Sequence, residues 1–225
     1  MVRNGEVGRM IKAVIFDMDG VIVDSEYYHY IVEKRILKKI GIDLSFEEAK
    51  KHAGMKTETF FRKILENHKK KADINELVKE KQKLVIDILK KRAKPIPGSI
   101  KLINLLKKNK IKLGIASSGK RERVEIILSK FKIRNKFDVV VTAEDVEHGK
   151  PDPEIFLLAS KKIGIKPEEC IVIEDSTNGV KAAKKAGMKC IGFVSKNSGK
   201  QDLSEADIVV DDMRKIDLDI IRRFS

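Results

Sequence analysis

Cysteine and long hydrophobic runs are both scarce in this sequence of 225 residues. The two cysteines, Cys170 and Cys190, each stand inside a short apolar run, so we expect them in buried strands and not in a redox pair or a metal site. No apolar stretch approaches the roughly 20 residues that a transmembrane helix needs. Residues 1–12 lack the apolar middle part of a secretory signal. We therefore expect a cytoplasmic protein with no membrane partner, either a monomer or a weak homo-oligomer.

The net charge of +14 raises the question of nucleic-acid binding. Lysines cluster along helical patterns, for example at 69–71 and 79–83, but acidic residues stand near most of these clusters, as on ordinary solvated helix faces. The sequence has no zinc-finger spacing, arginine-rich arm or strand with interleaved aromatic residues. We therefore expect no specific nucleic-acid partner, whereas a small anionic substrate would benefit from the same positive field.

The pattern of apolar residues predicts an α/β protein. Residues 13–16 form a short apolar run followed by acids, which is typical of a central parallel strand. After residue 98 helices and strands alternate, and this alternation predicts a Rossmann-like parallel sheet with right-handed crossovers. The expected helices are 99–108, 121–131, 153–163 and 178–186, and the expected further strands are 112–116, 138–142, 170–173, 189–194 and 208–210.

Residues 25–92 differ from the rest of the chain because their apolar positions recur only at helical spacing. Pro95 and Pro97-Gly98 mark the return to alternating strands and helices. We predict that residues 25–94 form an inserted α-helical cap domain over the end of the first strand. Residues 10–24 and 95–225 would then form the α/β core domain.

Polar residues follow four of the predicted strands. Each group has a structural alternative as a turn, a helix N-cap or a helix start. Since the carboxyl ends of parallel strands meet at one edge, where open α/β sheets bind ligands, the four groups together favour one functional site. The groups are Asp17-Met18-Asp19-Gly20, Ser117-Ser118-Gly119-Lys120, Lys150-Pro151-Asp152-Pro153 and Glu174-Asp175-Ser176.

These groups resemble, in order and over nearly the whole chain, the four signature motifs of the haloacid dehalogenase superfamily. The helical insertion is similar to the small helical cap of the branch that contains β-phosphoglucomutase and phosphoglycolate phosphatase. Because the dehalogenases have a single acid in the first motif, the second acid, Asp19, argues for phosphoryl transfer. The resemblance implies a Mg²⁺-dependent phosphatase that acts on a small phosphorylated metabolite, either a sugar phosphate or a phosphoglycolate-like ester. The alternative is a phosphosugar isomerase of the β-phosphoglucomutase type.

The residue types fit this chemistry. Asp17 would be the nucleophile that forms an aspartyl phosphate, and Asp19 would protonate the leaving oxygen and later deprotonate water. Ser117 and Lys150 would hold the transferring phosphoryl group. We expect Asp17, Asp19 and Asp175 to bind Mg²⁺, with Glu174 acting directly or through a water, because hard cations prefer oxygen ligands. A catalytically silent binding protein is disfavoured because no motif residue is missing.

The remaining expected substrate-binding residues flank the phosphoryl site or belong to the insertion. They are Gly20, His29, Lys56, Thr57, Lys81, Ser118 and Gly119. His29 and Lys81 match substrate-contacting positions of β-phosphoglucomutase, although Lys81 stands among other lysines, as on a solvated helix. The chain departs from the mutase pattern in two places: Thr57 stands where the mutase has an arginine for the second phosphate, and Gly119 replaces a hydroxyl residue.

Overall fold

The computed structural model describes residues 10–52, 55 and 57–224. Within these residues, six parallel strands form one sheet in the order β3-β2-β1-β4-β5-β6. The predicted Rossmann-like α/β fold is therefore confirmed. The strands are β1 (Ala13–Phe16), β2 (Lys112–Ser117), β3 (Val139–Thr142), β4 (Cys170–Glu174), β5 (Lys189–Phe193) and β6 (Ile208–Val210).

Strand β1 is central and buried on both faces. Val14 and Phe16 pack in the apolar cluster that includes α5 (Ser99–Lys108), α6 (Arg121–Lys130) and α9 (Leu218–Arg222). Ala13 and Ile15 point to the opposite face, where α7 (Glu154–Ile163) and α8 (Thr177–Lys185) cover the sheet. This burial on both faces explains why the strand is an unbroken apolar run and not an alternating one.

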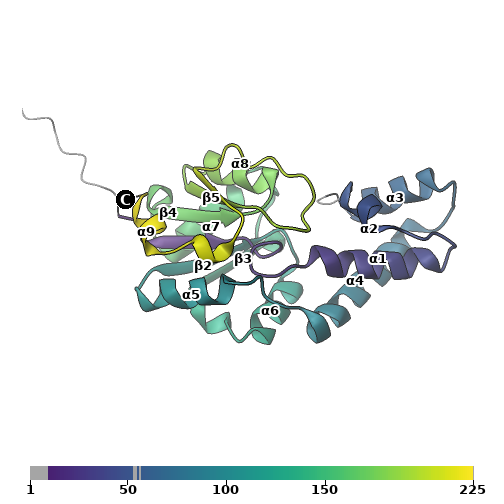
Figure 1. Cartoon of the computed structure of the whole chain (residues 1–225), viewed down its shortest axis with the longest axis horizontal. Helices are drawn as coiled ribbons and strands as arrows, with labels where there is room; N and C mark the ends of the chain where they lie inside the picture. Colours follow the sequence, from purple (N-terminus) through teal and green to yellow (C-terminus); the bar gives the residue numbers. More distant parts are fainter. Residues whose placement is uncertain (1–9, 53–54, 56, 225) are drawn as a thin grey trace, which may run out of the picture.

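The chain between β1 and α5 folds into helices α1 (Glu26–Lys38), α2 (Phe46–Lys50), α3 (Thr57–Asn67) and α4 (Ile74–Arg92). We call residues 26–92 the helical segment. Apolar residues of α1, α3 and α4 pack together in it, including Ile36, Phe61 and Leu89. Figure 1 shows the helical segment beyond one end of the sheet, where the carboxyl ends of the strands point.

The helical segment joins the sheet region through two connections that lie side by side. Val23 on the way in forms an antiparallel bridge with Pro95 on the way out, and the amide of Ile96 donates to the carbonyl of Ile22 at 2.8 Å. The ammonium of Lys130 on α6 also donates to the carbonyl of Lys90, at the end of α4, at 2.7 Å. Helix α4 is thus attached both to the connection and to α6.

Most expectations about the elements agree with the structure to within one or two residues. Cys170 and Cys190 are free and buried in β4 and β5, as predicted. Along the part of the chain that the structure describes, no helix is long and apolar enough to cross a membrane.

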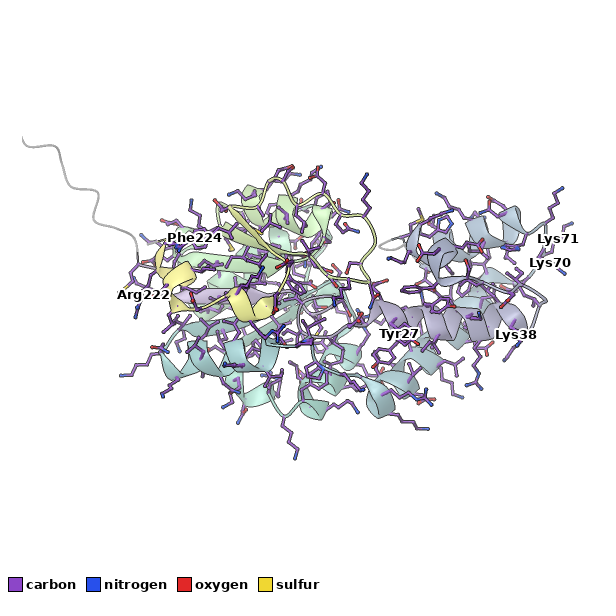
Figure 2. The ribbon with its side chains drawn as sticks, in the orientation of Figure 1. Tyr27, Lys38, Lys70, Lys71, Arg222 and Phe224 are labelled. Carbon is purple, nitrogen blue, oxygen red and sulfur yellow. The ribbon has the colours of Figure 1, made fainter. Side chains whose placement is uncertain are left out.

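Lys38, Lys70 and Lys71 are exposed, and Figure 2 shows them at the end of the helical segment farthest from the sheet.

Candidate active site

A cavity of about 510 Å³ lies between the carboxyl edge of the sheet and the helical segment. The predicted site residues that line it from the sheet region are Asp17, Asp19, Ser118, Lys150, Glu174 and Asp175, and those from the helical segment are His29, Thr57 and Lys81. Gly20, Ser117 and Gly119 lie next to lining residues in the chain but do not line the cavity themselves. Lys56 was also predicted to bind substrate, but it lies outside the described residues.

Lys150 is the centre of a buried charge cluster at the base of the cavity. Its ammonium donates at 2.6 Å to Oδ1 of Asp17 and at 2.6 Å to Oε1 of Glu174. It also donates to the carbonyl of Ala116 at 3.1 Å and lies 4.8 Å from the centre of the Phe156 ring. Burial alone would lower the pKa of Lys150, but the two carboxylates outweigh burial and raise it. Lys150 is therefore charged and fixed beside Asp17.

Glu174 lies at the junction of β4 and α8, and both of its carboxylate oxygens have partners: Lys150 binds Oε1 and Ser176 binds Oε2. Its Oε2 accepts from the amide of Ser176 at 2.8 Å and from the Ser176 hydroxyl at 2.9 Å. The same hydroxyl accepts from the amide of Gly179 at 3.1 Å and so caps α8. A Cβ at Gly179 would collide with the Glu174 carboxylate, so this corner needs a residue without a side chain.

The carboxylates at the base of the cavity outnumber the cations beside them. Burial, assisted by the charges of Glu174 and Asp19, raises the pKa of Asp17 to about 7 even though Lys150 opposes the shift. Burial, together with the charges of Glu174 and Asp17, also raises the pKa of Asp175 well above its usual range. Burial and the neighbouring carboxylates therefore both disfavour the ionised forms of Asp17 and Asp175.

A divalent cation would supply the missing charge, and the available donors suit one. Asp17 and Asp175 offer hard oxygen ligands, which Mg²⁺ prefers. Among the described residues no three acidic, histidine or cysteine side chains already surround a common point. Lys150 holds Asp17 and Glu174, and the hydroxyl of Ser198 donates to Oδ2 of Asp175. Gly20 has a φ of +76°, and a Cβ there would collide with the Asp175 carboxylate, so Asp175 packs directly on the first motif.

Two side chains hold the carboxylate of Asp19. Ser25, just before α1, donates to its Oδ1 at 2.5 Å. Arg123 on α6 donates to its Oδ2 at 2.5 Å and also contacts Nε2 of His29 at 2.9 Å. Sequence reasoning missed Arg123, because an arginine in the first turn of a charged helix looks like part of a solvated face.

Ser117 ends strand β2 and is fully buried. Its hydroxyl oxygen accepts from the amide of Gly119 at 3.0 Å, which fixes the turn that presents Ser118 to the cavity. The structure thus brings the second motif next to Asp17 through the pairing of β1 with β2.

Lys81 is buried and not part of a solvated helix face. Its ammonium forms an ion pair with Oε1 of Glu33 on α1 at 2.5 Å and lies 3.5 Å from the hydroxyl of Thr57. It also lies 5.5 Å from the centre of the Phe60 ring. The surface alternative for Lys81 is therefore wrong, since its neighbours in sequence point elsewhere while it faces the cavity.

Two further titratable groups of α1 line the cavity. Burial lowers the pKa of His29 well below its usual value, and the positive charges of Lys81 and Arg123 lower it further. Its Nδ1 is buried without a hydrogen-bond partner among the described residues. Burial and the charges of Asp19 and Glu33 raise the pKa of Glu26 to about 7. Sequence reasoning did not single out Glu26, nor the loop residues Asn197 and Ser198 that also line the cavity.

The family model described as haloacid dehalogenase-like hydrolase matches residues 14–193, which include all but the first residue of β1, the helical segment and every strand-end motif. This chain belongs to that family. The proteins that it resembles include several named as phosphatases and one named as a mutase.

Two relatives and one solved structure illustrate both kinds. The chain is 32% identical to β-phosphoglucomutase of Bacillus subtilis over 94% of both chains. It is 33% identical to a phosphorylated carbohydrates phosphatase of Thermotoga maritima, over 84% of this chain and 89% of that protein. The crystal structure of β-phosphoglucomutase from Clostridium difficile superposes with a TM-score of 0.77 at 30% identity, covering 96% of this chain and 97% of that one.

Proposed function

We propose that this hydrolase is a Mg²⁺-dependent phosphatase that acts on a small phosphorylated metabolite through an aspartyl-phosphate intermediate. The substrate class is a sugar phosphate or a phosphoglycolate-like ester. The observation that carries the proposal is the buried contact of Lys150 with Asp17, at the base of a cavity that Asp19 also lines. A fixed cation beside a carboxylate nucleophile suits a reaction in which negative charge develops on a phosphoryl group.

In this mechanism Asp17 attacks phosphorus and the bond to the leaving oxygen breaks. Asp19 gives its proton to the leaving oxygen and later takes a proton from the water that hydrolyses the aspartyl phosphate. Lys150 balances the charge on both Asp17 and the phosphoryl oxygens, while Ser117 fixes the turn from which Ser118 faces the cavity that would hold those oxygens. Glu174, held by Ser176, keeps Lys150 in place.

Asp17, Asp175 and the backbone carbonyl of Asp19 are the groups that would hold Mg²⁺. When bound, the ion would offset the negative charge of the acids and of the phosphoryl group. The crowding of buried carboxylates around Asp17 and Asp175 supports this assignment, because a cation would offset their mutual repulsion and favour their ionised forms.

The isomerase alternative is favoured by His29 and Lys81, which both line the cavity, and by the likeness to a protein named β-phosphoglucomutase. Thr57 weighs against it, because a threonine hydroxyl cannot replace the bidentate contact of an arginine with a distal phosphate. The protein named as a phosphatase of phosphorylated carbohydrates is equally similar to this chain. We therefore place hydrolysis first.

A screen of phosphate release from a panel of phosphorylated metabolites, run with and without Mg²⁺, tests the proposal. We expect release from some members of the panel, its loss with a chelator and its return with Mg²⁺. Ca²⁺ should support little turnover because its looser coordination misplaces the nucleophile. Asp175→Ala should behave like the chelated protein at moderate Mg²⁺. Equal release with and without the chelator would refute the metal dependence, and no release from any phosphate ester would refute the phosphatase.

A further inference from the structure

The loop that joins β5 to β6, residues 194–207, carries three polar residues that line the cavity. They are Asn197, Ser198 and Gln201. Figure 1 shows this loop extending from the sheet region toward the helical segment. Because these side chains face the cavity, the β5–β6 loop belongs to the site, although none of the four motifs includes it.

Ser198 contacts the acid of the fourth motif. Its hydroxyl donates to Oδ2 of Asp175, and both side chains are buried. Gly20 lies on the same side of the carboxylate, since a Cβ built there would collide with Oδ2 of Asp175 and with the hydroxyl of Ser198. Among the described residues, no group donates a hydrogen bond to Oδ1 of Asp175. The contact therefore occupies one oxygen of the carboxylate and leaves the other for a cation.

Two further contacts anchor the loop around Ser198. The side-chain amide of Gln201 donates to the carbonyl of Ser198 at 2.8 Å, and its oxygen accepts from the amide of Thr177 at 3.0 Å. Thr177 is the first residue of α8, just after the fourth motif. On the other side of Ser198, the amide of Asn197 donates to Oδ2 of Asp24 at 2.6 Å, where the chain leaves the first motif for α1. These anchors favour one position of the Ser198 hydroxyl.

The coordination of Mg²⁺ gives such a contact a purpose. Mg²⁺ demands near-ideal octahedral geometry, so a carboxylate ligand has to present an oxygen in a fixed orientation. Hydrogen bonds from neighbouring groups orient metal ligands, and their loss typically lowers the metal affinity by 10–100-fold. Lys150 holds Asp17 in this way. In the described part of the chain, Ser198 supplies the corresponding contact for Asp175.

We propose that Ser198 is a positioning residue for the Mg²⁺ site. Its hydroxyl holds Oδ2 of Asp175, so that Oδ1 is the oxygen available to the cation, and Asn197 and Gln201 keep the hydroxyl in place. The inference rests on the proposed Mg²⁺-dependent phosphatase and adds to it a residue outside the four motifs. Because coupling is reciprocal, a contact that favours Mg²⁺ binding is itself favoured when Mg²⁺ binds. The ion should therefore also stabilise the β5–β6 loop.

Isothermal titration calorimetry of the full chain, freed of metal by a chelator and titrated with Mg²⁺ alone, measures the effect without turnover. Ser198→Ala should raise the Kd for Mg²⁺ by about tenfold or more, because the Asp175 carboxylate loses its fixed orientation. Ser195→Ala is the matched control. It makes the same change at another buried serine of the loop, whose side chain has no hydrogen-bond partner among the described residues, and should leave the Kd unchanged.

Gln201 tests whether the anchoring acts through Ser198. Gln201→Ala should raise the Kd for Mg²⁺ by less than Ser198→Ala does, since the hydroxyl is still present. The double variant should bind Mg²⁺ no more weakly than Ser198→Ala, because the anchor has no effect once the hydroxyl is gone. Two changes in Kd that simply multiply would contradict the role given to Gln201.

Hydrogen–deuterium exchange and the Mg²⁺ dependence of turnover provide further readouts. Mg²⁺ should slow the exchange of the amides of residues 195–202 in the unmodified protein and in Ser195→Ala, but not in Ser198→Ala. Half-maximal phosphate release should need correspondingly more Mg²⁺ in Ser198→Ala. At saturating Mg²⁺ its kcat should return to near that of the unmodified protein, because Ser198 acts only through the metal site.

An equal Kd for Mg²⁺ in Ser198→Ala and in the unmodified protein would overturn the proposal, as would an equal loss of affinity in Ser195→Ala. Thermal unfolding in the presence of the chelator shows whether each variant is folded. If Ser198→Ala does not fold, Gln201→Ala and the exchange of the unmodified protein still decide. These outcomes differ from a failure of the proposed function, in which the unmodified protein would bind no Mg²⁺ and release no phosphate from p-nitrophenyl phosphate.

Discussion

Lys150 neutralises only part of the negative charge that the strand ends bring together. It contacts Asp17 and Glu174. Among the described residues, Asp175 has the Ser198 hydroxyl as its only side-chain hydrogen-bond partner, and Asp19 is bound by Arg123 and Ser25. Replacing an acid of this cluster should therefore change both the rate of phosphate release and the free energy of unfolding. These two quantities can be measured separately.

Replacing Asp17 by asparagine should abolish the activity without unfolding the protein. The amide has nearly the same shape but cannot form the acyl phosphate bond, so we expect phosphate release to fall by several orders of magnitude. The circular dichroism spectrum should stay that of the unmodified protein. Near-normal turnover in Asp17→Asn would refute Asp17 as the nucleophile.

The same substitution should reveal the raised pKa of Asp17 in the absence of Mg²⁺. The pKa rises from 3.8 to about 7 on folding, so between these values the folded protein binds more protons at this carboxyl than the unfolded chain does. Its contribution to stability is present at low pH and is lost as the pH rises through this window. The free energy of unfolding of Asp17→Asn, relative to the unmodified protein, should therefore rise across the window by a few kcal/mol at most.

Urea unfolding at a series of pH values, with a chelator present, measures this difference. Saturating Mg²⁺ serves as the control, since a bound cation favours the ionised carboxylate and should reduce the pH dependence. A difference between the two proteins that stays constant from acid to neutral pH would contradict the raised pKa.

Individual residues were predictable where a polar residue directly follows a buried apolar run. Asp17, Glu174 and Asp175 were found in this way because strand ends are marked by a sharp change in polarity. Lys81 and Arg123 lack such a mark, since a lysine or arginine on a helix usually faces solvent. Only the packing of α1, α4 and α6 around one cavity shows that these two point inward. The roles of all site residues stay predictions.

At the scale of elements, the corner between β4 and α8 supports the site. Strand β4 ends at Glu174 and α8 begins at Thr177, so the carboxylate that holds Lys150 is also attached to the first turn of α8. A change in the first turn of this helix should therefore affect catalysis although the residue changed has no chemical role.

Gly179→Ala tests that coupling. Alanine favours a helix by roughly 1 kcal/mol over glycine, but its Cβ would collide with Glu174, and overpacking of this kind costs about 1–3 kcal/mol. We expect a net loss of stability and a lower kcat, because Glu174 and Lys150 must shift. Gly149→Ala is the control for stability, since a Cβ there meets open space. Unchanged stability and kcat in Gly179→Ala would show that the corner adapts freely.

The strands and most helices were predictable because apolar residues recur at different spacings in strands and in helices. Proline and glycine also mark the boundaries between these elements. The positions of α1 to α4 within residues 26–92 were not predicted one by one, since a short helix such as α2 has too few turns to show a period. The division of the chain into a core domain and a cap domain stays a prediction.

At the scale of the whole molecule, the balance between hydrolysis and isomerisation depends on how well the helical segment excludes water. An isomerase must hold its intermediate until another sugar hydroxyl takes the phosphoryl group. Lys81 already has Glu33 as its partner and Thr57 offers one hydroxyl, so the helical segment has little to hold a distal phosphate.

We expect β-glucose 1-phosphate, offered with a trace of the 1,6-bisphosphate, to yield inorganic phosphate faster than glucose 6-phosphate. Thr57→Arg should increase the affinity for doubly phosphorylated sugars, and Thr57→Gln serves as an uncharged control of similar reach. Both products can be followed by coupled assays in one reaction. An excess of glucose 6-phosphate from the unmodified protein would favour the isomerase.

The paired connections at Val23 and Pro95 also affect how such a protein can diversify. Because the chain leaves the sheet region and returns to it at one place, a different set of helices can be grafted there without changing the strand order or the four motifs. In the proposed function, the part of substrate recognition that the helical segment supplies would then be encoded in one continuous stretch of the gene, apart from the four motifs. A chimaera that carries a relative's insertion between these two residues should take the donor's substrate preference while it keeps the nucleophile and lysine of this chain.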